Sequence, residues 1–173
     1  MRHATVVAGL VLGLVGVACG SSNNTTPGSC SVTVSGGTSA STSCGLAVAT
    51  TAASAGKVFF GMSANAGGTI TAAQVIFNQT SLQTGTYGSS SGTSVTSAAA
   101  TVATAGGMSW NQFFQTSGTP DEGSFTLTIS STGSSVPAGS YTGWPDPDGS
   151  LTVTLEPEAS TGAIGTVTMT VTF

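Results

Sequence analysis

The feature that most constrains the fold is a strict alternation of apolar and polar residues in the last third of the chain. The apolar residues Phe125, Leu127 and Ile129 are separated by threonines. Residues 151–155 repeat this alternation, and so do residues 167–173. Successive side chains of a strand point to opposite faces, so a period of two predicts strands with one buried and one polar face. Antiparallel sheets that cover a core on one side have this pattern.

Further strand candidates follow one another at short intervals. Glycine-rich breaks separate them, and we expect strands at residues 46–50, 57–63, 69–78, 94–104, 108–115, 124–130, 139–144, 150–156 and 165–173. The alanine-rich run 97–105 could form a helix instead, although its threonines, its valine and the flanking glycines favour a strand. Many short strands predict an all-β chain, an antiparallel β-sandwich that is jelly-roll-like or Greek-key, after an N-terminal signal helix.

Two of the three cysteines fit a disulfide bond across the first hairpin. A three-residue loop centred on Gly37 places Ser35 opposite Ser39, and therefore Cys30 opposite Cys44. Directly opposed residues have Cα atoms about 4.5–5.5 Å apart, which a disulfide bond can span. We therefore expect Cys30 and Cys44 to be bonded; the alternative is two unpaired thiols.

The N-terminus has the composition of an export signal. Arg2 places a positive charge ahead of the apolar run 5–17, which is shorter than the roughly 20 residues of a transmembrane helix. The segment 16–19, Gly-Val-Ala-Cys, resembles the lipobox of bacterial lipoproteins. In that family the cysteine is lipidated and becomes the first mature residue, although leucine is more common where this chain has Gly16.

The resemblance implies a lipid on Cys19, and the number of cysteines agrees with it. If Cys30 and Cys44 pair, Cys19 is the odd cysteine, and an exported protein needs an explanation for one. We therefore expect a signal peptide at 1–18, a flexible tether at 19–29 and a single β-sandwich domain at 30–173. The protein would be exported and lipid-anchored at the outer membrane or cell surface. The alternative is a plain secretory signal that is cut near residue 18 or 20.

Charge and histidine content exclude several functions. Beyond residue 18 the chain keeps one basic residue, Lys57, and all six acidic ones. One cation cannot neutralise a row of phosphates, so we expect no nucleic-acid partner. The single histidine, His3, lies in the signal, so the mature chain has no imidazole for Ser-His-Asp catalysis or a histidine metal site. We expect no cofactor and no enzymatic activity.

The carboxylates offer two weak candidate sites. Asp146 and Asp148 lie beside a glycine and could contribute to a calcium site, but calcium takes six to eight oxygen ligands, and a turn is the other interpretation. Glu156 and Glu158 flank Pro157 and could hydrolyse a glycosidic bond if they were held about 5–9 Å apart across a sugar. Proline at this point favours the end of a strand instead.

Three aromatic residues, Trp110, Tyr141 and Trp144, are candidate ligand-binding residues. If exposed they would stack on sugar rings, and if buried they would fill the core. The sequence therefore predicts a membrane-anchored exported lipoprotein with a non-enzymatic binding or structural domain. The alternatives are a carbohydrate-binding module and a glycan hydrolase that uses a carboxylate pair. The expected partners are the membrane, through the lipid, and a glycan or envelope protein.

Overall fold

The structure is a computed structural model that describes residues 30–44, 46–52, 56–89, 94–116, 123–138, 141–144 and 146–173. The regular secondary structure in these ranges is β-strand apart from a short 3-10 turn at Ala159–Thr161, and all strand pairs are antiparallel. The predicted all-β antiparallel fold is confirmed, whereas the predicted signal helix and tether lie outside the described residues. The strands are β1 (Ser31–Gly36), β2 (Ala40–Ser43), β3 (Leu46–Ala52), β4 (Lys57–Ala66), β5 (Thr69–Phe77), β6 (Gly85–Gly88), β7 (Val95–Ala103), β8 (Ser109–Gln115), β9 (Ser124–Ser131), β10 (Val136–Ala138), β11 (Tyr141–Trp144), β12 (Asp148–Pro157) and β13 (Val167–Thr172).

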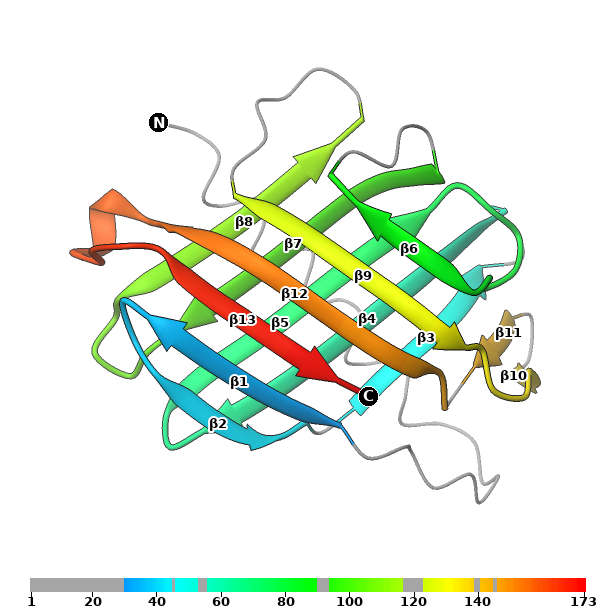
Figure 1. The fold of residues 1–173 in the computed structure, drawn as a ribbon, viewed down its shortest axis with the longest axis horizontal. Coiled ribbons are helices and arrows are strands. Elements are labelled where there is room, and N and C mark those ends of the chain that lie inside the picture. Colours follow the sequence, from blue (N-terminus) through cyan, green and yellow to red (C-terminus); the bar gives the residue numbers. More distant parts are fainter. Residues whose placement is uncertain are drawn as a thin grey trace.

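The strands form two layers whose directions cross (Figure 1). The front layer has the order β6-β9-β12-β13-β1-β2, and the back layer has the order β10-β11-β3-β4-β5-β7-β8. The layers are joined where the end of β12 leaves the front layer: Glu156 pairs with Asn111 of β8, and Pro157 pairs with Trp110. The fold is therefore a sandwich that is closed along one edge.

Alternate residues of both layers meet in one core. The back layer contributes Phe60 and Trp110, and the front layer contributes Leu155 and Met169, all four of which are fully buried. The ring of Phe60 lies 4.9 Å from the ring of Phe173 between centroids. The period of two in the sequence therefore corresponds to one buried face in the front layer. In the middle of the back layer both faces are buried, because Ala72, Gln74 and Ala99, which alternate with core residues, are at most 5% exposed.

The alanine-rich run is a strand, as expected. β7 places Ala98, Ala99 and Ala100 opposite Phe114, Phe113 and Gln112 of β8, so small residues lie beside large ones across the pair. Small side chains leave room for large neighbours on the same face, which is how a close-packed layer is filled. The strands β6 and β10 have no counterpart among the expected strands; both are short, with three or four residues.

The first hairpin has the predicted register. Ser31 pairs with Ser43 and Val34 pairs with Ala40, so the loop is centred on Gly37. Cys30 and Cys44 are disulfide-bonded, with their Cα atoms 4.9 Å apart. The disulfide bond predicted from the sequence is thus confirmed, and it closes the end of the hairpin at the edge of the front layer.

Candidate functional site

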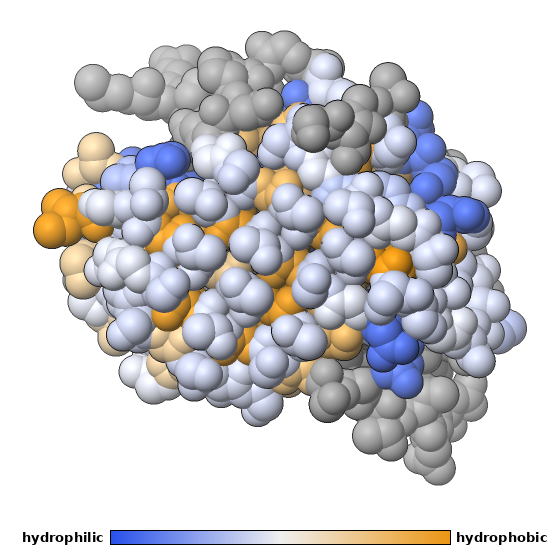
Figure 2. Space-filling view, in the orientation of Figure 1, coloured by the Kyte–Doolittle hydropathy of each residue, from blue (hydrophilic) through white to orange (hydrophobic). Residues whose placement is uncertain are grey.

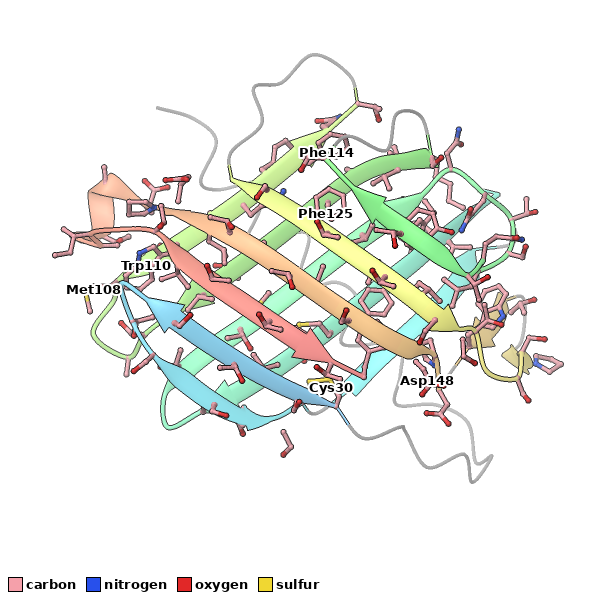
Figure 3. The ribbon with its side chains drawn as sticks, in the orientation of Figure 1. Cys30, Met108, Trp110, Phe114, Phe125 and Asp148 are labelled. Carbon is pink, nitrogen blue, oxygen red and sulfur yellow. A yellow bond between two sulfur atoms is a disulfide. The ribbon has the colours of Figure 1, made fainter. Side chains whose placement is uncertain are left out.

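The two tryptophans proposed for ligand binding are core residues. Trp110 is fully buried, and its indole N–H donates a 2.8 Å hydrogen bond to the carbonyl oxygen of Gly165. Trp144 is 6% exposed. Figure 3 shows Trp110 beneath the front layer, near the edge where the layers join. A buried ring offers no face to a sugar, so the prediction that these two residues bind a ligand is corrected; the side chain of Tyr141 lies outside what the structure describes.

The candidate carboxylates form two groups at opposite ends of β12. Asp146 and Asp148 are exposed, and Asp148 begins β12 (Figure 3), whereas Glu156 lies near the other end of that strand, about 26 Å away at the rise of a strand. Glu158 is engaged locally, because its Oε1 accepts a 3.0 Å hydrogen bond from the hydroxyl of Ser160. Within the described ranges, no three His, Cys, Asp or Glu side chains could hold one metal ion. The described residues therefore offer no support for a calcium site at Asp146 and Asp148, and of the expected pair Glu156 and Glu158, the second is already hydrogen-bonded to Ser160.

A different feature dominates the front layer: its outward face is built from hydroxyl-bearing side chains. Buried valines, leucines and phenylalanine alternate with these residues and fix which side they occupy. We call this surface the hydroxyl face, and its residues are Ser31, Thr33, Ser35, Ser41, Ser43, Ser124, Thr126, Thr128, Ser150, Thr152, Thr154, Thr168, Thr170 and Thr172.

Strand register arranges the hydroxyl face in rows. In the central row Thr33 pairs with Thr170, Thr170 with Thr152, and Thr152 with Thr126. Ser41 continues this row on β2. The parallel rows on either side pass through Thr172 and Thr168, each again paired with hydroxyl residues on both neighbouring strands. The face is therefore a grid rather than a scatter of polar side chains.

The hydroxyl face carries almost no charge. On the five strands that build it, the only ionisable side chains are Asp148 and Glu156, at the two ends of β12. Figure 2 shows this side of the molecule as pale, weakly hydrophilic surface with apolar patches between the pale side chains. Lys57 lies on β4 in the back layer, where its Nζ is 3.5 Å from the hydroxyl of Thr96.

Hydroxyls of the central row are available to a ligand. Thr33, Thr126, Thr152 and Thr170 are exposed, and none of their side chains hydrogen-bonds to another residue that the structure describes. At the edge of the layer, by contrast, the hydroxyl of Thr128 lies 3.3 Å from that of Thr86. Sequence reasoning missed this grid, because the Thr-x-Thr alternation shows which residues face outward but not which strands are neighbours.

Comparisons with known proteins give no relative: no family matches the chain, and no curated protein or solved structure matches it. In the described part of the chain, no helix has the length and apolar character required to cross a membrane.

Proposed function

We propose that this protein is an exported lipoprotein, held at the cell envelope by a lipid on Cys19, whose β-sandwich is a non-enzymatic binding domain. The lipobox-like segment 16–19 supports the anchor. The Cys30–Cys44 bond supports it further, because it leaves Cys19 as the one cysteine without a cysteine partner in the chain. An acylated cysteine is neither a free thiol nor half of a disulfide bond.

The observation that carries the binding role is the hydroxyl face. A typical protein surface mixes charges of both signs, whereas this face presents ordered, neutral groups that both donate and accept hydrogen bonds. The face covers the outer side of five strands of the front layer and points away from the back layer (Figure 1). A contact surface of this kind suits a large, uncharged target better than a small molecule, which needs a concave site.

The alternatives have less support. A carbohydrate-binding module that stacks sugars on Trp110 or Trp144 would require the ring that it uses to leave the core. A glycan hydrolase would need two carboxylates that face one sugar. The described acids form two groups at opposite ends of β12, and Glu158 accepts a hydrogen bond from a neighbouring serine. Without histidine in the mature chain, a serine or threonine hydroxyl lacks the usual general base.

Cell fractionation tests the anchor. The full chain, a Cys19→Ser variant and a Ser21→Ala control are expressed in a bacterial host, and membrane and soluble fractions are compared. We expect the native chain and Ser21→Ala in the membrane fraction and Cys19→Ser in the soluble fraction. If Cys19→Ser stays with the membranes, the lipid anchor is wrong.

Matched substitutions on the two layers test the binding face. Thr152→Lys places a charge in the centre of the hydroxyl face, whereas Thr101→Lys places it on the outer side of β7 in the back layer. The detergent-solubilised full chain is applied to arrays of glycans and purified envelope proteins. We expect Thr152→Lys to abolish a binding signal that Thr101→Lys retains; a binding signal that survives Thr152→Lys would place the contact surface elsewhere.

A further inference from the structure

The spacing of the hydroxyl face limits what can bind it. Neighbouring strands of a sheet lie about 4.8 Å apart, and alternate residues along one strand lie about 6.7 Å apart. The register places hydroxyl residues at both repeats, from Thr33 through Thr170 and Thr152 to Thr126 in one direction and from Thr168 to Thr170 in the other. The face therefore repeats in two nearly perpendicular directions.

The chemistry of the face limits its ligand further. Each hydroxyl has one donor and two acceptor positions, like a water molecule in which a carbon atom replaces one hydrogen. A single exposed hydroxyl gains little from a new hydrogen bond, because it gives up an equivalent bond to water. Useful binding therefore requires many such groups to engage at once, as in multivalent recognition. The ligand must itself repeat in two dimensions with matching spacing.

Ice has that repeat. Oxygen atoms on the prism faces of hexagonal ice recur in two perpendicular directions at distances close to those of the strand grid, and each one is a hydrogen-bond donor and acceptor. We propose that the hydroxyl face binds the surface of ice crystals, with threonine hydroxyls occupying positions of the water lattice. This inference rests on the proposed function, in which the same face is the contact surface.

Other ordered targets fit less well. Mineral surfaces present ionic charge, and the central rows of the face have none to complement it. Crystalline polysaccharide sheets expose flat sugar rings, whose stacking partners are aromatic side chains. The outward positions of the hydroxyl face hold no aromatic residue, because Phe125, Leu127 and the apolar residues of β12 and β13 all point into the core.

The face is held in a fixed shape, as lattice recognition requires. The axes of the antiparallel strands β1, β13, β12 and β9 are nearly aligned across the view in Figure 1. Their inner sides are fully packed, since Val34, Met169, Val153 and Leu127 are at most 2% exposed. The Cys30–Cys44 bond ties the end of β1 to β2. A surface that is already ordered loses little conformational freedom on binding.

Ice-affinity partitioning tests the proposal with the detergent-solubilised full chain. A polycrystalline ice surface is grown slowly in the protein solution, and the protein concentrations in ice and liquid are compared. Thr170→Tyr raises a bulky ring in the centre of the grid, and Thr101→Tyr makes the same change at a strand position on the back layer. Tyrosine is well tolerated in strands, and unfolding curves check that both variants keep the fold.

We expect the native chain and Thr101→Tyr to be enriched in ice, and Thr170→Tyr to lose about a hundredfold or more of that enrichment, since one raised side chain prevents simultaneous contact by the others. The proposal is overturned if the native chain is excluded from ice like ordinary solutes, or if the two variants partition equally. Sedimentation with crystalline cellulose and chitin is run in parallel. Binding there without enrichment in ice would overturn ice as the ligand while leaving the contact surface of the proposed function in place.

Discussion

The indole N–H of Trp110 donates a 2.8 Å hydrogen bond to the carbonyl oxygen of Gly165, and so joins β8 of the back layer to the loop before β13 of the front layer. Trp110→Phe keeps a ring in the core but loses this hydrogen bond and part of the packed volume. We expect a loss of about 1–3 kcal/mol in the free energy of unfolding. Urea denaturation measures it, and a loss below about 0.5 kcal/mol, as for a surface residue, would show that the bond does not help to join the layers.

Gly37 lies at the same junction. A Cβ atom at this position would overlap the carbonyl oxygen of Ile164 and lie 3.1 Å from Nε1 of Trp110. Gly37→Ala should therefore destabilise the protein by about 1–3 kcal/mol, the usual cost of overpacking. Gly106→Ala is the control, because its nearest contact would be the hydroxyl of Thr104 at an ordinary 3.7 Å. Equal unfolding midpoints for the two variants would contradict the close approach at Gly37.

The disulfide bond stabilises the first hairpin chiefly by restricting the unfolded chain. Cys30 and Cys44 are 14 residues apart, and a loop of this size corresponds to about 3 kcal/mol. The double variant Cys30→Ala and Cys44→Ala should lose stability of this order in denaturant titrations. Cys19→Ser, which affects neither partner, should unfold like the native chain; a similar loss in that variant would point to a different pairing.

The two sides of β12 should differ in how strongly an exchange between valine and threonine changes stability. Val153 is 1% exposed, so Val153→Thr buries a hydroxyl and should cost about 1–3 kcal/mol. Thr152 is exposed on the hydroxyl face, so Thr152→Val should change stability by less than about 0.5 kcal/mol. Thermal unfolding of the two variants measures the contrast. A larger loss for Thr152→Val would mean that the faces are assigned the wrong way round.

Local patterns were sufficient for much of the fold. The alternation in residues 151–155 and 167–173 predicted strands with one buried face, and the position of Gly37 predicted the register that joins Cys30 to Cys44. These features depend on residues close together in the chain. The strand β6, by contrast, contains two glycines in four residues and lacks a periodic signal.

The candidate site required information that local patterns do not contain. The pairing of β1 with β13 brings Thr33 beside Thr170, although most of the chain separates them in the sequence. No short-range rule predicts that they are neighbours. The burial of Trp110 also depends on residues far away in the chain. The alternation within its strand separates two faces but does not say which of them is the core. The threonines could thus be predicted to face outward, but their assembly into one grid could not.

The lipid on Cys19 is the part of the proposed function that one measurement tests most directly. The native chain is purified from the membranes of a bacterial host, and its N-terminal peptide is analysed by mass spectrometry. The proposal predicts that this peptide begins at Cys19 and carries the added mass of a diacylglyceryl group. A peptide that begins elsewhere, or an unmodified Cys19, would contradict the lipoprotein assignment.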